Sequence, residues 1–273
     1  GAGEVGDSED LVTHQNTYHD GMLRLHALLA DWLRMENVVV LMGAGCSVSS
    51  GGHTMASLER AVLSAVAAVP GLPQAAKKLI SDRLESKEEP PEWSKIGFEA
   101  WLSYLSNIAY LISNPCSPVS DSTWKANTSP SSDDLKVLLR YISRAIFAEC
   151  ALVLQDLSHS ADGEEQIAPH IPFFAKLIAR DSNLGRTHVF TLNYDTLIEQ
   201  ALDTLGIHCF DGFSGRARAH FDPSVYGLDL YYPGDVAEGR VRRFDKFLHF
   251  YKLHGSIHWR QNNGGVIAQH VDL

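Results

Sequence analysis

Residues 37–52, Asn-Val-Val-Val-Leu-Met-Gly-Ala-Gly-Cys-Ser-Val-Ser-Ser-Gly-Gly, constrain the fold more than any other stretch. The unbroken apolar run from Val38 to Met42 predicts a central strand of a parallel sheet, covered on both faces. It ends in Gly43-Ala44-Gly45, where missing side chains allow a sharp turn and the close approach of a ligand. A helical pattern follows, with Thr54 as its N-cap. Because a glycine turn and a helix N-terminus both present amides to an anion, we interpret this stretch as a cradle for a pyrophosphate.

Composition and cysteine spacing exclude several classes of protein. The net charge of −10 argues against a nucleic-acid-binding surface on this segment. No apolar stretch approaches the ~20 residues of a membrane span, and the N-terminus carries no basic-then-apolar secretion signal. The four cysteines are far apart and form no Cys-x-x-Cys pair. We therefore expect no structural zinc and a cytoplasmic location.

The order of apolar patterns along the chain predicts an α/β fold with a parallel sheet. Helices are expected at 20–35, from about 55, and at 74–85, 96–112, 133–157, 171–180 and 196–205. Strands are expected at 38–42, 187–192, 207–210, 228–232 and 247–253. Residues 113–132 are rich in Ser, Pro, Asn and Thr and predict an exposed loop. The late second strand implies a helical insertion, which we place at residues 70–185.

Three of the predicted strands end in polar residues that are able to bind a ligand. These ends are Gly43 to Ser47, Asn193 to Asp195, and His254 to Ser256. In an open parallel sheet, ligands bind at the carboxyl ends of the strands, so we expect the three ends to share one crevice. Each motif also has an ordinary structural interpretation: Asn193 and Asp195 as turn and cap residues, and His254 as a hydrogen-bonded histidine beside a turn glycine.

The combined motifs resemble the sirtuin family. The matching runs are Gly43-Ala44-Gly45-x-Ser47, Thr191-Leu192-Asn193-Tyr194-Asp195 and Lys252-Leu253-His254-Gly255-Ser256. More narrowly, the chain resembles the sirtuin-like NAD-hydrolase domains of bacterial antiphage defence proteins, in which a Phe/Ile-Glu-x-x-Leu helix lies over the site. Here that helix corresponds to Phe98-Glu99-Ala100-Trp101-Leu102. The resemblance covers residues 37–60, about 96–112, 187–205 and 247–259.

Two departures from known sequence motifs argue against a nicotinamide dehydrogenase and against a protein deacylase. Val48 stands where the dinucleotide fingerprint Gly-x-Gly-x-x-Gly has its third glycine, which counts against an ordinary nicotinamide dehydrogenase. The protein deacylases of the family carry Gly-Ile-Pro-Asp-Phe-Arg after the first loop and a four-cysteine zinc module after His-Gly. Neither is present in this sequence.

The resemblance implies a Rossmann-like parallel sheet and NAD as the substrate, with no metal. Asn193 and His254 would form the catalytic pair. Residues that would bind NAD share the three strand ends: Gly43, Ala44, Gly45, Ser47, Asp195, Gly255 and Ser256. It also implies one sirtuin-like domain over residues 1–273, a homo-oligomer, and a fused or associated sensor or effector domain activated by phage. Because the family fold continues beyond the position of His254, we expect a further C-terminal region.

The predicted reaction is hydrolysis of NAD to ADP-ribose and nicotinamide, leading to depletion of cellular NAD. His254 is a suitable general base at neutral pH, and Asn193 is suited to hold ribose or water beside the anomeric carbon. The sequence leaves open whether His254 deprotonates water or a ribose hydroxyl, and whether the dinucleotide is NAD or NADP. Alternatives are a module that binds NAD or ADP-ribose without turnover, a protein deacylase or ADP-ribosyltransferase, and a catalytically silent assembly domain.

Overall fold

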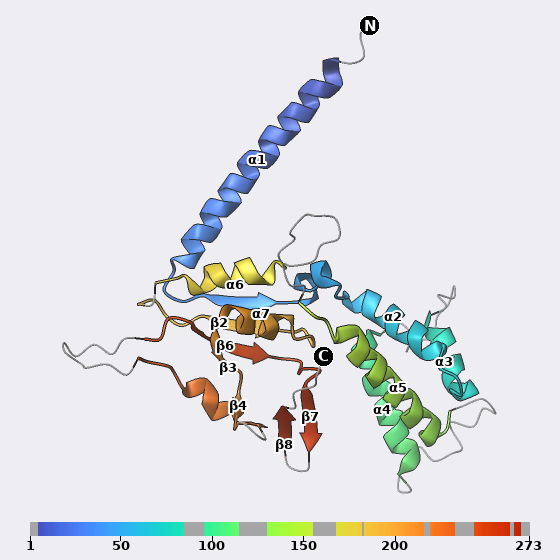
Figure 1. Cartoon of the computed structure of the whole chain (residues 1–273). Helices are drawn as coiled ribbons and strands as arrows, with labels where there is room; N and C mark the ends of the chain where they lie inside the picture. The colour runs from blue at the N-terminus through green and yellow to red at the C-terminus, as the bar shows by residue number, and fades with distance from the viewer. Residues whose placement is uncertain are drawn as a thin grey trace.

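The computed structural model describes residues 5–84, 96–114, 130–154, 168–181, 183–215, 219–232, 243–262 and 265–268. Figure 1 shows three parts: a sheet with its covering helices, a group of helices at one end, and the long helix α1 (Val5–Leu33), which projects away from both. The helices α2 to α6 all lie between the first and second strands in the chain.

The central sheet contains four described strands, all parallel. They are β1 (Val39–Met42), β2 (His188–Thr191), β6 (Phe247–Lys252) and β3 (His208–Phe210), in the order β1-β2-β6-β3. This confirms the α/β fold with a parallel sheet. The connections from β1 to β2 and from β2 to β3 run through α-helices, whereas the described part of the connection from β3 to β6 contains β4, β5 and the 3-10 helix η4 (Pro223–Gly227).

The prediction that the first strand is central and covered on both faces is wrong for the described strands. β1 lies at the edge of the sheet, and the side chains of Val39 and Leu41 are each 66% exposed. Val40 and Met42 point the other way and pack in the apolar core beneath the helices. An edge strand with apolar residues on both faces has the same sequence pattern as a buried strand, so the apolar run could not separate the two cases.

One face of the sheet is covered by the helices α6 (His170–Ile178) and α7 (Leu197–Leu205). Phe174 and Leu202 from these helices join a core that includes Val189 and Phe250 of the sheet. The opposite face carries aromatic and histidine side chains from alternate strand positions. There the ring of Tyr226 stacks on Tyr251, with centroids 4.3 Å apart.

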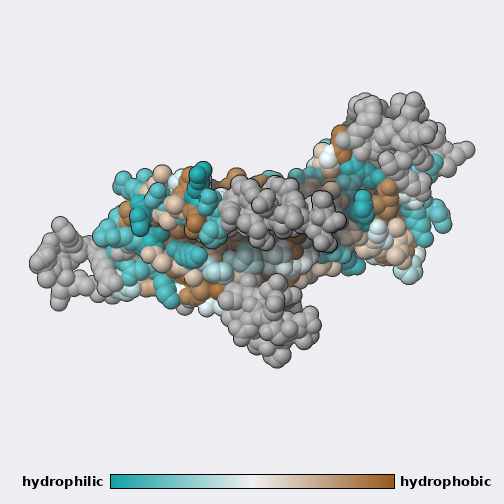
Figure 2. Space-filling view, turned by 90° about the horizontal axis from the view of Figure 1, so that it is seen from above, coloured by the Kyte–Doolittle hydropathy of each residue, from teal (hydrophilic) through white to brown (hydrophobic). Residues whose placement is uncertain are grey.

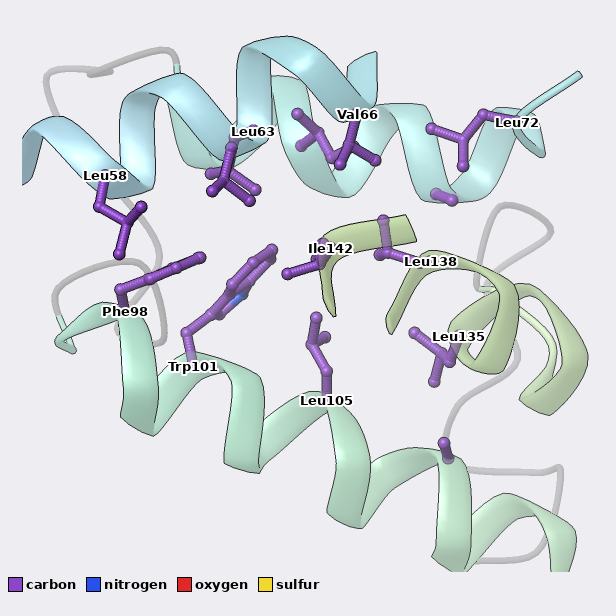
Figure 3. Close-up of a cluster of buried hydrophobic side chains, with 14 of the residues drawn as sticks. Leu58, Leu63, Val66, Leu72, Phe98, Trp101, Leu105, Leu135, Leu138 and Ile142 are labelled. Carbon is purple, nitrogen blue, oxygen red and sulfur yellow. The ribbon is translucent and has the colours of Figure 1, made fainter. Parts of the chain in front are cut away.

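The helices α2 (Met55–Ala67), α3 (Gln74–Leu84), α4 (Phe98–Ser113) and α5 (Ser132–Cys150) form a separate apolar cluster. Figure 3 shows its interior, where α5 faces α2 and α4. Trp101, Leu138 and Ile142 are at most 1% exposed. The cluster takes in α2 and leaves out α6, which packs on the sheet instead.

Helix ends follow capping chemistry that the sequence only partly revealed. Thr54 caps α2 as expected, accepting a hydrogen bond from the amide of Ser57. α5 is capped by Ser131, whose side chain and that of Asp134 form a reciprocal capping box, so the helix begins one residue before the predicted start at 133. α5 ends at Cys150, and residues 151–154 are not helical, which also shortens the predicted helix.

The strands outside the central sheet were not predicted correctly. The strands β4 (Phe213–Ser214), β5 (His220–Phe221), β8 (Gly265–Ala268) and β7 (Trp259–Asn262) form a small antiparallel sheet that the sequence did not reveal. The expected strand at 228–232 contains only an isolated bridge between Tyr231 and Arg243. The predicted loop at 113–132 falls largely outside the described residues.

Arg180, just after α6, fixes the end of α1 to the sheet. Its guanidinium donates to the carbonyl oxygens of Leu33 at 2.9 Å and Met35 at 2.6 Å, and to the hydroxyl of Thr187 at 2.8 Å. These bonds use carbonyls at a helix C-terminus that have no partner within the helix. Arg180 therefore holds the junction between α1 and β1 together with the backbone amide of Gly185, which donates to the carbonyl oxygen of Glu36 at 2.8 Å.

None of the helices in the described part of the chain is long and apolar enough to cross a membrane. On the face seen from above, polar and apolar residues are interspersed (Figure 2).

Candidate functional site

The register of the sheet brings the three predicted strand ends to the same level. Met42 of β1 pairs with Thr191 of β2, and Thr191 pairs with Lys252 of β6. Gly43, Leu192 and Leu253 therefore leave the sheet side by side at its carboxyl edge. The three strands therefore belong to one parallel sheet, as predicted, and their ends lie at the same edge of it.

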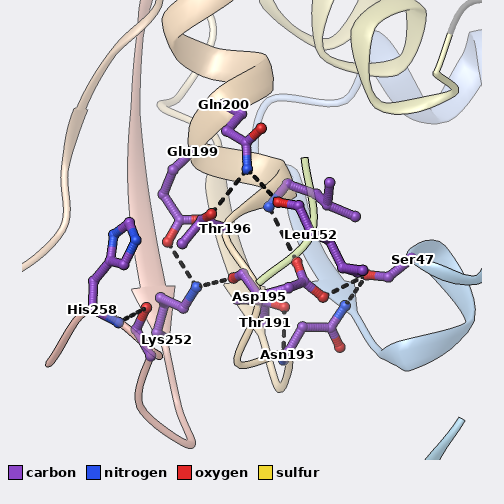
Figure 4. Close-up of polar contacts among 12 residues, drawn as sticks. Ser47, Leu152, Thr191, Asn193, Asp195, Thr196, Glu199, Gln200, Lys252 and His258 are labelled. Carbon is purple, nitrogen blue, oxygen red and sulfur yellow. Dashed lines mark hydrogen bonds and ion pairs between the residues drawn. The ribbon is translucent and has the colours of Figure 1, made fainter. Parts of the chain in front are cut away.

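A buried hydrogen-bond network joins two of these strand ends (Figure 4). The side-chain amide nitrogen Nδ2 of Asn193 donates to the hydroxyl of Ser47 at 2.9 Å and to the carbonyl oxygen of Gly43 at 3.1 Å. The hydroxyl of Ser47 in turn donates to Oδ2 of Asp195 at 2.7 Å. Ser47, Asn193 and Asp195 are 2%, 7% and 8% exposed. Their geometry is thus fixed by the protein.

The orientation of the Asn193 amide follows from its partners. A backbone carbonyl can only accept, so the nitrogen of the amide must face Gly43 and the oxygen must face away. Oδ1 of Asn193 accepts no hydrogen bond from any residue that the structure describes. Asn193 consequently presents one oriented acceptor that is free for a ligand.

The glycine turn differs from the expected strand–turn–helix unit. After Gly43 the chain forms the short 3-10 turns η1 (Ala44–Cys46) and η2 (Val48–Ser50), and α2 begins only at Met55. The N-terminus of α2 therefore does not follow the glycine turn directly. The amides of Ala44 and Gly45 donate to no residue among those described, which leaves two donors at the turn.

Gly52 explains how Ser47 is held so closely. A Cβ atom at Gly52 would lie 2.6 Å from Cβ of Ser47 and 2.8 Å from its carbonyl oxygen. The amide of Gly52 donates to that same oxygen at 2.8 Å. Any larger residue would displace Ser47, so this glycine supports the buried network.

Lys252 and Glu199 support Asp195 from below. Nζ of Lys252 donates to the carbonyl oxygen of Asp195 at 2.5 Å and pairs with Oε1 of Glu199 at 2.7 Å. The Lys252 side chain is only 4% exposed. Oδ1 of Asp195 also accepts from the amide of Leu197, so Asp195 fastens the start of α7 as well.

His254 lies in a cluster with Tyr194 and Glu99. Oη of Tyr194 donates to Oε1 of Glu99 at 2.8 Å, and Nδ1 of His254 is 3.9 Å from the same oxygen. Burial raises the pKa of the Tyr194 phenol, and the hydrogen bond to Glu99 raises it further, so Tyr194 remains a donor. The His254 side chain is 43% exposed. Glu99 thus brings the start of α4 next to the strand end that carries His254.

Gly255 and Ser256 shape the turn after β6. Gly255 has a φ of 90°, a left-handed conformation that favours glycine. The hydroxyl of Ser256 accepts a hydrogen bond from the amide of His258 at 3.3 Å. Both residues therefore have an observed role in turn geometry.

A small cavity of about 50 Å³ opens beside the buried network. Its lining includes Asn193, Asp195 and Tyr194 from the end of β2, and Ala44 from the glycine turn. It does not include His254, so the structure brings Asn193 and the turn together but leaves His254 outside this cavity.

Three further cavity-lining residues were missed at the level of the sequence. His53 follows the glycine turn, and Glu149 and Cys150 end α5. Burial raises the pKa of the Cys150 thiol to about 11, and the negative charges of Asp195 and Glu149 contribute to that rise, so the thiol is protonated at neutral pH. No spacing rule joins His53 to Glu149, because they are 96 positions apart in the chain.

A larger hollow of about 440 Å³ lies on the other side of the turn, beside the open edge of β1. Its walls are mostly apolar and include Leu41, Met42 and Phe173, with Gly45 of the turn at its rim. Pockets of this size accommodate small organic ligands. Among the described residues there is no group of three or more His, Cys, Asp or Glu side chains placed to hold a metal ion.

A protein-family model matches the part of the chain that carries the ends of β2 and β6. Residues 187–270 match the family model of the SIR2-like domain. Over these residues the chain is similar to a SIR2-like domain. The match runs from β2 through the small sheet and includes Asn193, Asp195 and His254, whereas the glycine turn lies outside it. At the level of the family, the SIR2-like domain points to NAD as the molecule that this site binds or uses. A comparison with curated proteins gave no match.

Proposed function

We propose that this protein cleaves the bond between nicotinamide and ribose in NAD, releasing nicotinamide and ADP-ribose. The observation that carries the proposal is Asn193: its amide is locked between Gly43 and Ser47, and its free oxygen stands at the end of a strand of the SIR2-like domain. This bond breaks through a transition state with positive charge on the ribose, since nicotinamide leaves as a neutral molecule. An oriented, uncharged acceptor can hold water or a ribose hydroxyl beside that charge.

The other residues of the proposed site take roles that agree with their contacts. The free amides of Ala44 and Gly45 would bind the pyrophosphate. Ser47 and Asp195 would hold Asn193 in place, because the single hydroxyl proton of Ser47 is already committed to Asp195. The hollow beside Gly45 would receive the adenosine half of NAD.

His254 remains our second catalytic candidate, with Gly255 and Ser256 shaping the turn that carries it. Oε1 of Glu99 lies 3.9 Å from Nδ1 of the His254 ring. Its exposed position suits contact with a ribose hydroxyl at the mouth of the site.

The setting of the activity is a proposal from the resemblance to antiphage NAD-hydrolase domains. In that setting the reaction would deplete NAD in the cytoplasm of an infected cell. A homo-oligomer and a fused or associated sensor domain would control it. These parts of the proposal depend on turnover being observed first.

The test is nicotinamide release from NAD by the full-length protein. We expect turnover by the wild type and a loss of about 100-fold or more in Asn193→Ala, because one preorganised polar contact contributes on this scale. The matched control is Asn183→Ala, an exposed asparagine that bonds only locally to Asp181, and it should retain full activity. Full activity in Asn193→Ala would refute the assignment of this residue.

A second candidate function is binding of NAD or ADP-ribose without turnover. It is favoured by one observation: His254 does not line the cavity that Asn193 lines. Calorimetry that shows NAD binding by the wild type, with no nicotinamide released across oligomeric states, would support this function over hydrolysis. A protein deacylase or ADP-ribosyltransferase would instead need an acceptor, which the same assay can supply as an added acyl-lysine or arginine peptide.

A further inference from the structure

The cavity beside Asn193 contains a histidine–carboxylate pair. Nε2 of His53 lies 2.9 Å from Oε2 of Glu149, and both residues line the cavity together with Asn193. His53 comes from the segment between η2 and α2, and Glu149 from the last turn of α5. Their side chains are 28% and 32% exposed, so the pair is partly shielded but still reached by solvent.

The carboxylate determines which nitrogen of His53 can act as a base. A carboxylate only accepts hydrogen bonds, so in the neutral ring Nε2 carries the proton and Nδ1 carries the lone pair. Nδ1 makes no hydrogen bond with any residue in the described part of the chain. A histidine oriented by an acid through one nitrogen, with the other nitrogen free, is the arrangement that general bases use.

The position of Glu149 relative to Asn193 is fixed by α7. Gln200 donates to the carbonyl oxygen of Leu152 at 2.8 Å and accepts from the amide of Leu154 at 2.7 Å. These bonds attach the segment after α5 to the helix that starts just after Asp195. The pair and the amide therefore belong to one rigid wall.

The volume of the cavity suits water better than an organic ring. About 50 Å³ provides room for roughly one to three water molecules, given that each occupies about 30 Å³ in the liquid. A water molecule there would have polar partners among the lining side chains, which include Asn193 and His53. The other titratable side chains of the lining are Asp195, Tyr194 and Cys150, of which the phenol and the thiol are neutral at pH 7.

We propose that His53, oriented by Glu149, is the general base that activates the attacking water; this rests on the proposed hydrolysis of NAD. The water oxygen forms the new bond to C1′ of the ribose while its proton moves to Nδ1 of His53. The bond from C1′ to the pyridinium nitrogen breaks, and its electron pair neutralises the departing nicotinamide. Glu149 stabilises the imidazolium, which then releases the proton to solvent. His254, which pairs with Glu99, keeps its separate proposed role at a ribose hydroxyl.

The rate of nicotinamide release as a function of pH tests the assignment. In the wild type, kcat should rise with pH as the base loses its proton. His53→Gln should lower kcat by about 100-fold or more and abolish this limb, with KM changed far less. The matched control is His26→Gln, an exposed histidine on α1, which should keep both the rate and the limb.

The variant Glu149→Gln tests whether His53 is a catalytic base or a residue that only holds the loop in place. The variant keeps a hydrogen-bonding side chain but loses the negative charge that favours the imidazolium, so the limb should move to lower pH. A purely structural contact would not move it. This variant also keeps the test open if His53→Gln proves unstable in a thermal melt.

The outcomes are distinct for the inference and for the proposed function. Wild-type kcat and an unchanged limb in both variants, with Asn193→Ala inactive, would overturn the role of His53 and leave NAD hydrolysis standing. An inactive wild type under all conditions would overturn both. A limb that disappears in His254→Gln but persists in His53→Gln would transfer the role of base to His254.

Discussion

Replacing Lys252 should lower the free energy of unfolding by an amount that the structure lets us estimate. Lys252→Met keeps an unbranched side chain but deletes the ammonium group, whose nitrogen lies 5.8 Å from the centroid of the Phe250 ring. Glu199 then loses its only described side-chain partner, while its Oε2 is already buried without one. Breaking a fully buried ion pair costs about 3–5 kcal/mol, and Glu199 is 31% exposed, so we expect a loss of about 2 kcal/mol in the free energy of unfolding.

The assay is urea unfolding followed by circular dichroism, with a double-mutant cycle. Lys252→Met combined with Glu199→Gln should recover at least half of the loss, because the uncompensated charge is gone. A single variant within about 0.5 kcal/mol of the wild type would refute the reasoning, since surface substitutions have effects of that size. Equal losses in the single and double variants would refute the role of the charge.

The same pair predicts a pH dependence whose sign is fixed. Burial raises the pKa of Glu199 above its ordinary value, and Lys252 counteracts that rise. Without Lys252 the folded state binds a proton more readily than the unfolded state does, so stability must increase as the pH falls. The penalty of Lys252→Met should therefore shrink as the pH falls from neutral toward the ordinary pKa of a glutamate, about 4.3. A penalty that grows on acidification would contradict this account.

Three further predictions concern the core, the turn and the cavity thiol. Leu138→Ala, at a fully buried position, should lower the free energy of unfolding in urea by about 3 kcal/mol, whereas Leu41→Ala on the exposed face of β1 should change it by less than about 0.5 kcal/mol. Gly52→Ala should reduce nicotinamide release at least ~10-fold by displacing Ser47, one of the residues that hold the side-chain amide of Asn193, while Gly21→Ala, with open space around it, serves as the control. Cys150, with its pKa raised to about 11, should resist alkylation by iodoacetamide at about pH 8 in peptide mass spectrometry, and rapid labelling would show that the thiol is not held protonated.

The sequence predicted the elements with strong local signals. Apolar runs located β2, β3 and β6, and the polar residues after Thr191 and Lys252 marked the carboxyl edge where the site forms. The position of β1 at the sheet edge was not predictable in this way. Strand order depends on pairing between distant segments, whereas the apolar run records only local burial.

The missed parts of the site share a physical cause. His53 and Glu149 meet only because α2 and α5 pack together, and no local pattern reports that contact. In the sequence Lys252 is an ordinary strand residue, and only the structure shows its ion pair with Glu199. Polar pairs assembled by tertiary packing are therefore the part of a site that sequence reasoning reaches last.

The projecting helix α1 has a mechanical consequence. Its 29 residues extend about 43 Å at ~1.5 Å per residue, and its lower end runs directly into β1 and the glycine turn (Figure 1). Arg180 holds that end in place through hydrogen bonds to the carbonyl oxygens of Leu33 and Met35. A force applied at the tip of the helix is a torque on this joint, and the first backbone to feel it is the strand that positions the partner of Asn193.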